Sequence, residues 1–148
     1  MRRLAKAARL SAGDWCVLLR AGALLPVARI AVRVLTFRGI RSWVQQRPLR
    51  SKHGRRRPAS PERVAYLVDL AARYCLWKPT CLERSLTLYR LLRKMGVEAR
   101  FIVGTKVPPA GFAAHAWVEH NGRVLGGQGE DGYQELLSVE NAAIRQDL

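Results

Sequence analysis

The segment from Thr80 to Gly96 constrains the fold more than any other part of the chain. Thr80 can cap a helix, and Glu83 three residues later can return a hydrogen bond to it, which is the capping-box pattern. Apolar residues then recur every three or four positions, and glycine is a typical residue just past a helix C-terminus. The pattern therefore predicts a helix whose first residue is Cys81.

The hydrophobic period changes after this helix. Residues 97–104 and 112–120 alternate as strands do, and Asn121-Gly122 predicts a tight turn into a short third strand at 123–127. From Gly126 the chain is rich in glycine, and we expect another helix from about Ser138. A helix followed by antiparallel strands predicts an α+β fold.

A second helix is expected to begin at Ser60-Pro61, with serine as the cap and proline at the first helical position. Its apolar positions form one continuous face that ends at Cys75. Packing therefore explains this cysteine, and no chemistry need be assigned to it.

The N-terminal part is strongly basic. Residues 1–60 hold 15 Lys/Arg and one acid, Asp14, whereas residues 61–148 are nearly neutral. We divide the chain into a basic amphipathic helical arm over 1–46, a basic linker over 47–60 and a domain over 61–148. The helix of the arm is expected to begin at the capping signal of Ser11 and Asp14 and to extend to about Gln46, with a break near Pro26.

Apolar residues recur along this arm at helical spacing. They are Leu24, Val27, Ile30, Val34 and Leu35. One interpretation is a helix packed on the domain with its arginines in water. The other is a docking surface for a membrane or a partner protein.

Charge and cysteine content narrow the partners and the compartment. The excess of positive charge favours anionic partners, such as an acidic protein or an anionic membrane surface, but no nucleic-acid reader motif is present. Arg29 ends the longest uncharged stretch of the arm, which we judge too short to span a bilayer. An odd number of cysteines at no disulfide-like spacing predicts a cytoplasmic protein. The basic arm would allow that protein to associate with a membrane surface. The spacing predicts neither a metal site nor a cofactor.

Cys81 and His115 are the pair that could carry chemistry. Free backbone N–H groups and the dipole of a helix N-terminus stabilise a thiolate, and a nearby histidine can take its proton and later protonate a leaving group. His115 lies in the 112–120 strand among alanines, whereas His120 and His53 are expected to be exposed. The pair alone is also compatible with a core cysteine and a structural histidine.

A resemblance adds to this pattern. The stretches "AARYCLWKPTCLERSLTLYRLLRKMGVEARFIVG" and "FAAHAWVEHNGRVLGG" resemble the leader peptidase of lasso-peptide biosynthesis, the peptidase half of a split maturation protein. That family is part of the transglutaminase-like, papain-like cysteine superfamily. The resemblance covers roughly residues 64–127 and rests on Cys81 followed by "HAWVE".

The family implies a Cys–His–Asp arrangement, which maps onto Cys81 and His115. Its third member is where this chain departs from the pattern, because glycines 126 and 127 stand where an acid is expected. Asp131 is our candidate, with Glu130 and Glu119 as alternatives, and a site without a third member also stays open.

The resemblance implies a hydrolase that cleaves the leader from a ribosomally made lasso-peptide precursor during antibiotic biosynthesis. A separate leader-recognition protein would deliver the precursor leader peptide, and a separate ATP-using macrolactam synthetase would close the freed core. The alternative is a non-catalytic transglutaminase-like adaptor that docks its partners through the basic arm.

Overall fold

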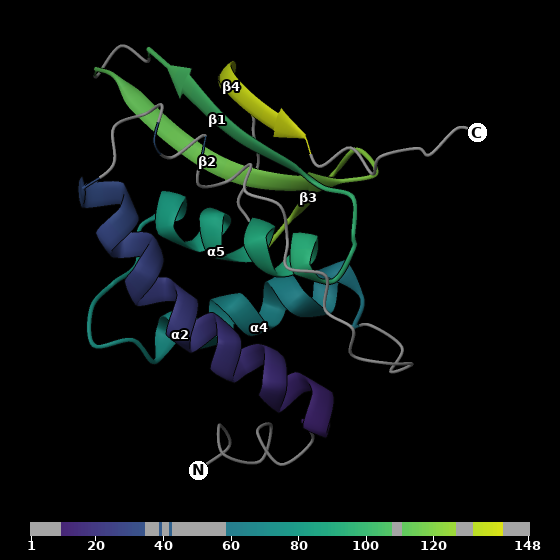
Figure 1. The fold of residues 1–148 in the computed structure, drawn as a ribbon. Helices are drawn as coiled ribbons and strands as arrows, with labels where there is room; N and C mark the ends of the chain where they lie inside the picture. Colours follow the sequence, from purple (N-terminus) through teal and green to yellow (C-terminus); the bar gives the residue numbers. More distant parts are fainter. Residues whose placement is uncertain are drawn as a thin grey trace.

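In a computed structural model of the chain, the described residues form three helices on one side of a four-stranded sheet (Figure 1). The structure describes residues 10–34, 39, 42, 59–107, 111–126 and 132–140. The helices are α2 (Ala12–Val34), α4 (Pro61–Arg73) and α5 (Cys81–Lys94), and the strands are β1 (Arg100–Lys106), β2 (Ala113–His120), β3 (Arg123–Leu125) and β4 (Gln134–Glu140). The predicted α+β class is confirmed. The predicted linker at 47–60 lies almost entirely outside the described residues.

All neighbouring strands of the sheet are antiparallel, in the order β3-β2-β1-β4. Asn121 and Gly122 connect β2 to β3 with φ angles of 50° and 73°. Both angles suit the tight hairpin turn that the Asn-Gly pair predicts. The β1, β2 and β3 strands were thus predicted from sequence, with β1 beginning and ending slightly later than expected.

The helix expected from Ser138 is wrong for the residues that can be compared, because Ser138, Val139 and Glu140 belong to β4. β4 pairs with the edge of β1 that β2 leaves free, and Val139 of β4 is buried in the core. Pairing with a strand more than thirty residues earlier in the chain decides the conformation here, over the local helix preference of the sequence.

The predicted caps of α4 and α5 are confirmed. Ser60 accepts a hydrogen bond from the Arg63 amide, and Thr80 and Glu83 form both hydrogen bonds of a capping box. Gly96 follows α5 with a φ of +74°, a conformation that favours glycine. The apolar faces of both helices pack into one hydrophobic core together with the inner face of the sheet.

The predicted break of the N-terminal helix near Pro26 is wrong, because α2 continues through Pro26. Proline costs a helix one hydrogen bond and introduces a steric conflict with the preceding turn. Leu25 and Ala28 on either side of it are fully buried in the core. We infer that this packing offsets the cost of proline inside the helix.

α2 packs on the domain with a different face from the one that the sequence pattern suggested. The fully buried residues of α2 are the small Ala21 and Ala28 and the larger Leu25, which lie against α4 and α5. Of the predicted apolar stripe, Val27, Ile30 and Val34 are exposed. The small Ala21 and Ala28 allow the helix axes to approach closely, Leu25 fills the core beside them, and Val27, Ile30 and Val34 lie on the other side of the helix.

α2 also corrects the expectation that this segment is too short to span a bilayer. Its 23 residues have a mean hydropathy of 1.7 over the most apolar window, so by length and composition alone the helix is able to cross a membrane. The expectation counted only the uncharged residues that precede Arg29, whereas the hydropathy of a longer window stays high with charged residues in it.

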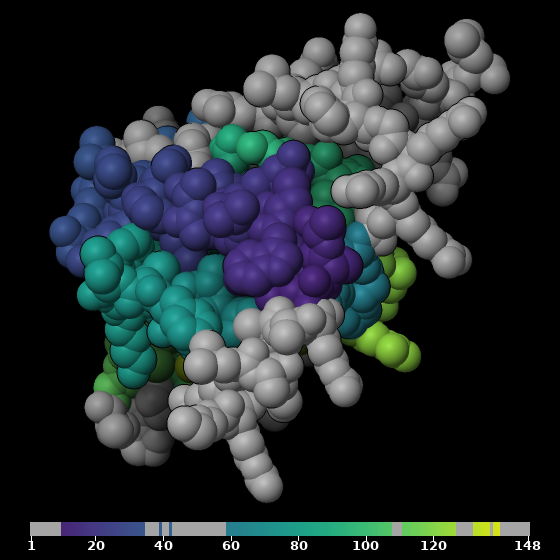
Figure 2. Space-filling view, turned by 90° about the horizontal axis from the view of Figure 1, so that it is seen from below, coloured from purple at the N-terminus to yellow at the C-terminus, as the bar shows by residue number. Residues whose placement is uncertain are grey.

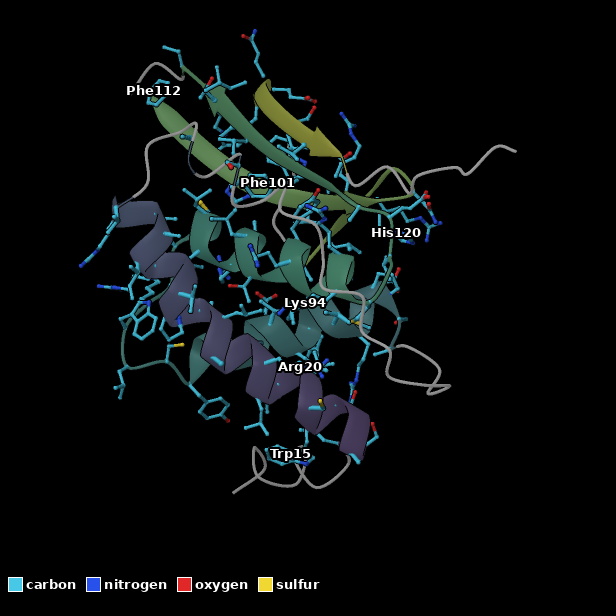
Figure 3. The ribbon with its side chains drawn as sticks, in the orientation of Figure 1. Trp15, Arg20, Lys94, Phe101, Phe112 and His120 are labelled. Carbon is cyan, nitrogen blue, oxygen red and sulfur yellow. The ribbon has the colours of Figure 1, made fainter. Side chains whose placement is uncertain are left out.

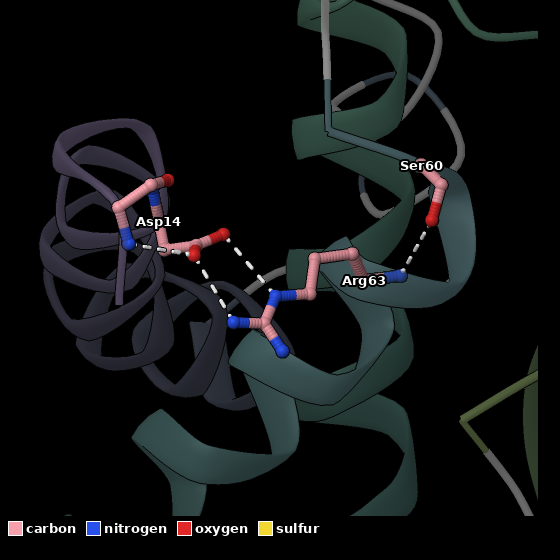
Figure 4. A network of polar contacts seen from close by, with 4 residues as sticks. Asp14, Ser60 and Arg63 are labelled. Carbon is pink, nitrogen blue, oxygen red and sulfur yellow. Dashed lines mark hydrogen bonds and ion pairs between the residues drawn. The ribbon is translucent and has the colours of Figure 1, made fainter. Parts of the chain in front are cut away.

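Asp14 joins the beginning of α2 to α4 through an ion pair with Arg63 (Figure 4). Its carboxylate accepts hydrogen bonds from Nε and Nη2 of Arg63 at 3.2 and 3.0 Å and from the Ser11 amide at 3.0 Å, while the Asp14 amide donates to the Ser11 hydroxyl. The hydrogen bonds from Arg63, helped by those from Ser11, lower the pKa of Asp14 from 3.8 to about 2. Asp14, which the sequence predicts as part of a helix cap, thus also makes a tertiary contact with α4.

We expect Asp14→Asn to lower the free energy of unfolding at neutral pH by about 1 to 2 kcal/mol, because the charge-assisted pair with the partly exposed Arg63 is lost. The stabilisation belongs to the ionised carboxylate. It is present above a pH of about 4, the pKa of an unfolded aspartate, and it disappears as the pH falls through about 2. Urea unfolding at several pH values measures this difference.

Asp69→Asn is the matched control for that measurement. Burial raises the pKa of Asp69 despite its ion pair with Arg84, so ionised Asp69 contributes no comparable stability. We expect this variant to be close to neutral at pH 7. An Asp14→Asn variant that is as stable as Asp69→Asn at pH 7 would show that the pair with Arg63 does not hold α2 to α4.

Candidate active site

Cys81 occupies the first position of α5, in a turn that several hydrogen bonds hold in place. The buried carboxylate of Glu83 accepts from the Thr80 amide at 3.1 Å and from the Trp77 indole at 3.3 Å. The Cys81 side chain is half-buried, and its thiol is free of any disulfide. Amides in the first turn of a helix have no acceptor within the helix, so they can bind an anion beside this thiol.

Ser85 connects this end of α5 to the strand that bears the histidine. Its hydroxyl donates a 2.8 Å hydrogen bond to the carbonyl of Ala116, and this contact is buried. Among the described residues, β3 pairs with Val118–His120 of β2 and with no earlier residue of that strand, so the Ala116 carbonyl precedes the paired stretch. The helix thus contacts β2 at the residue that follows His115.

A second contact gives the direction of α5 along the strand. The ring of Tyr89, one turn after Ser85, lies 5.9 Å from the ring of Phe101, which pairs with Val118 of β2. α5 therefore runs alongside β2 in the same direction as the strand (Figure 3). Cys81, one turn before Ser85, lies toward the beginning of β2, where His115 is found.

His115 is on the face of the sheet opposite the helical core. Ala116 and Val118 belong to the core that the helices cover, and residues between them in a strand point to the other face. There the imidazole lies 6.0 Å from the Trp117 ring and 5.5 Å from the Tyr133 ring. Its Nε2 atom is buried and has no hydrogen-bond partner among the described residues.

The structure therefore places Cys81 and His115 toward the same end of the molecule but on opposite faces of the sheet, and no hydrogen bond joins them. A buried polar atom without a partner is rare in folded proteins and calls for an explanation. Hydrogen bonds between catalytic groups are often long or poorly aligned until substrate is bound. The unpaired Nε2 is compatible with a catalytic role, whereas the position of His115 on the face opposite α5 counts against direct proton exchange with Cys81 in this conformation, so the role stays a prediction.

The candidates for the third member of the site have different surroundings. The two oxygens of Glu119 accept from the Trp117 indole at 3.0 Å and from Arg100 at 3.3 Å, so this carboxylate is already engaged. Asp131 and Glu130 lie outside the described residues. Tyr133, which contacts His115, follows Asp131 by two positions in the sequence.

An acidic side chain at position 126 could not orient His115, because it would point toward α4. The φ of Gly126 is +62°, and a Cβ atom built there would lie 3.1 Å from Cβ of Ala65 in α4. The packing of this chain therefore favours glycine at position 126, one of the two positions that break the family pattern, and Gly127 lies outside the described residues.

His120 has a structural explanation. Its Nδ1 atom lies 2.6 Å from the carbonyl oxygen of Glu98, and its Nε2 atom lies 3.1 Å from the side-chain nitrogen of Asn121. These contacts fix the β2–β3 turn at the far end of β2 from His115. His53 lies outside the described residues.

A cleft of about 440 Å³ opens beside the segment that leads into α5. Its lining includes the basic residues Arg73, Lys78 and Arg84 together with Trp77. Cys81 does not line the cleft, although Lys78 and Arg84 stand three residues before and after it in the chain. The cleft is thus a feature next to the candidate nucleophile, with a mainly positive lining.

The structure confirms that packing explains Cys75, which lies against the hydrophobic core. Burial and the nearby Glu83 carboxylate raise the pKa of its thiol. We expect Cys75 in the folded protein to react with iodoacetamide at neutral pH at least about fivefold more slowly than the exposed Cys16, because only the thiolate is nucleophilic. Mass spectrometry of each alkylated peptide against time gives both rates, and urea should make them equal. Equal rates in the folded protein would contradict the burial of Cys75.

Ser85 and Tyr133 are contacts of the site that the sequence analysis missed. Ser85 is one turn after Cys81 on the same side of the helix, so helical periodicity could have drawn attention to it. No comparable signal exists for Tyr133, because its contact with His115 depends on the pairing of β4 with β1.

Comparison with known proteins gives one match. Residues 23–138 match the family model described as the transglutaminase-like superfamily, a range that covers α2 from its middle onward, the other described helices and most of the sheet. Neither the curated proteins nor the solved structures contain a match.

Proposed function

Because the chain belongs to the transglutaminase-like superfamily, whose members are commonly cysteine-dependent enzymes, we propose that it is a cysteine peptidase. Its substrate in this proposal is a ribosomally made lasso-peptide precursor, from which it removes the leader. The main support is the position of Cys81, in a capped first turn whose helix contacts β2 at the residue next to His115. The resemblance of the Cys81 and "HAWVE" segments to the leader peptidase supports the substrate class.

The reaction is acyl transfer to water. Sγ of Cys81 attacks the carbonyl carbon of the peptide bond between leader and core, and His115 accepts the thiol proton. Collapse of the tetrahedral intermediate breaks the C–N bond, and the same histidine protonates the departing core amine. Water then hydrolyses the thioester, which releases the leader as a carboxylate and restores the thiol.

The first turn of α5 supplies charge stabilisation for this reaction. The Cys81 amide has no acceptor within the helix and is our candidate donor to the oxyanion. The capping bonds of Thr80 and Glu83 hold this turn before substrate arrives. Preorganised donors of this kind need no rearrangement when charge develops.

Asp131 is our candidate for the group that orients His115. It stands two residues before Tyr133, whose ring contacts the imidazole, whereas the carboxylate of Glu119 is bound to Trp117 and Arg100. An acid in this role holds the imidazole in one orientation and stabilises its charged form. Asp131→Asn should therefore lower the turnover number more than Glu119→Gln does.

The proposed partners follow from the resemblance. A separate leader-recognition protein delivers the precursor, and a macrolactam synthetase uses the amine that cleavage frees. The basic N-terminal residues offer a surface that complements acidic partners.

Reconstitution with precursor peptide and the leader-recognition protein tests the proposal. In water enriched in heavy oxygen, we expect mass spectrometry to find one heavy oxygen in the leader carboxylate and none in the core. Products with an unlabelled leader carboxylate would contradict hydrolysis. No cleavage of the lasso precursor, together with thiol-dependent hydrolysis of another peptide, would contradict the substrate but not the enzyme class.

The alternative is a non-catalytic adaptor with the same fold. It is supported by the placement of Cys81 and His115 on opposite faces of the sheet, without a hydrogen bond between them among the described contacts, and by the engaged carboxylate of Glu119. The adaptor predicts that Cys81→Ala leaves precursor maturation intact, whereas the peptidase predicts its loss.

A further inference from the structure

An exposed apolar strip runs along the outer side of α2. We define the outer strip as five side chains that recur at helical spacing and remain exposed in the folded chain: Trp15, Leu19, Val27, Ile30 and Val34. Figure 2 shows α2 lying across the surface of the molecule, and Figure 3 shows Trp15 on the side of the helix away from the sheet. A contiguous apolar surface of this kind usually marks an interaction site.

The charges beside the outer strip have one sign. Arg20 and Arg33 are exposed on α2, and Arg29 lies with its guanidinium 5.0 Å from the Trp77 ring. The one acid of the helix, Asp14, is buried and paired with Arg63. The strip is thus bordered by arginines, with no acid of α2 exposed beside it.

The opposite side of α2 is committed to the core. Ala21, Leu25 and Ala28 are buried against α4 and α5, and the Asp14–Arg63 ion pair joins α2 to α4. Although α2 is long and apolar enough to cross a membrane, spanning it would remove Ala21, Leu25 and Ala28 from the core and separate Asp14 from Arg63. The packed helix therefore offers only one apolar side to a membrane.

We propose that α2 docks the protein on an anionic lipid bilayer, with the helix in the plane of the interface and the outer strip inserted at the headgroup boundary. A 23-residue helix is roughly 34 Å long, so the whole strip can lie on one flat surface. The arginines beside it complement anionic headgroups, and they belong to the 15 Lys/Arg of residues 1–60. A lipid surface accepts a convex apolar strip without a matching groove, which is why we favour it over a protein partner.

This orientation directs the sheet away from the bilayer. α4 and α5 lie between α2 and the sheet, so the sheet faces away from the bilayer when α2 lies on it (Figure 1). His115 is on the outer face of that sheet. The proposal goes beyond the peptidase reaction and does not depend on it.

Vesicle flotation of the full chain tests the docking surface. We expect binding to vesicles of phosphatidylglycerol and phosphatidylcholine and much weaker binding to phosphatidylcholine alone. Ile30→Gln should reduce binding to the anionic vesicles about tenfold, because it replaces apolar surface with a hydrated amide. Leu136→Gln on β4 is the matched control, because Leu136 is 63% exposed and Ile30 is 62% exposed.

Arg33→Gln tests the charge in the same assay, with the exposed Arg123→Gln on β3 as its control. We expect the first to weaken binding several-fold and the second to leave it unchanged. Both apolar positions are exposed, so circular dichroism should show the wild-type fold in every variant.

Several outcomes would overturn the proposal. These are the absence of binding to anionic vesicles, equal binding to neutral ones, or an Ile30→Gln variant that binds as well as Leu136→Gln. A wild-type dimer that Ile30→Gln converts to a monomer would make a second copy the occupant of the strip. If Ile30→Gln loses binding to the leader-recognition protein while its lipid binding is unchanged, the outer strip is a site for that protein.

Discussion

Cys81→Ala is expected to lower the single-turnover rate of leader cleavage at least about a thousandfold, since it removes the proposed nucleophile. His115→Ala should produce a loss of similar order, because the histidine both activates the thiol and protonates the leaving amine. The double variant should lose little more than either single variant, as expected for groups that act as a unit. Cleavage is measured by mass spectrometry with saturating leader-recognition protein.

The chain offers matched controls for both changes. Cys16→Ala removes an exposed thiol, and His120→Ala removes an imidazole whose contacts fix the turn between β2 and β3. Both should retain wild-type cleavage within a fewfold range. A Cys81→Ala variant as active as Cys16→Ala would remove the peptidase proposal and favour the adaptor.

Local rules predicted the elements that local interactions determine. The caps at Ser60 and Thr80, the glycine after α5 and the Asn121-Gly122 turn all depend on residues within a few positions of one another. The same rules failed where distant residues decide. Ser138 is in a strand because β1 offers it a partner, and α2 continues through Pro26 because its neighbours are buried.

The orientation of α2 could not be predicted for a related reason. A stripe of large apolar side chains suggested the buried face, yet the core takes Leu25 with the small Ala21 and Ala28 and leaves Ile30 and Val34 outside. Hydrophobic periodicity identifies an amphipathic helix, but the close approach of α4 and α5 selects which side is buried.

The sequence identified two residues of the candidate site but not their setting. Cys81 and His115 follow from a capped helix and a strand, whereas their placement at one end depends on the Ser85 bond to Ala116. The contact between Tyr133 and His115 requires β4 to pair with β1. Such contacts arise from tertiary structure, and no local pattern encodes them.

Gly104 is the position where the sheet leaves least room for change. It pairs with His115 across β1 and β2, and a Cβ atom at Gly104 would lie 2.7 and 2.8 Å from two ring carbons of Trp117. It would also lie 3.1 Å from the carbonyl oxygen of Gln134. The Trp117 side chain is almost completely buried, so its ring has little freedom to move away.

Gly104→Ala should therefore lower the free energy of unfolding by about 2 to 4 kcal/mol and displace the Trp117 ring, because real Cβ atoms do not approach so closely. Gly22→Ala is the matched control. Apart from the neighbouring residues and backbone of α2 itself, no atom lies within 4 Å of the added methyl group, so we expect stabilisation by about 0.5 to 1 kcal/mol. Urea unfolding measures both values, and near-ultraviolet circular dichroism reports the environment of the tryptophans. If Gly104→Ala is as stable as the wild type with an unchanged tryptophan signal, Trp117 does not cover Gly104, and the contact of its ring with His115 on the outer face of the sheet is wrong as well.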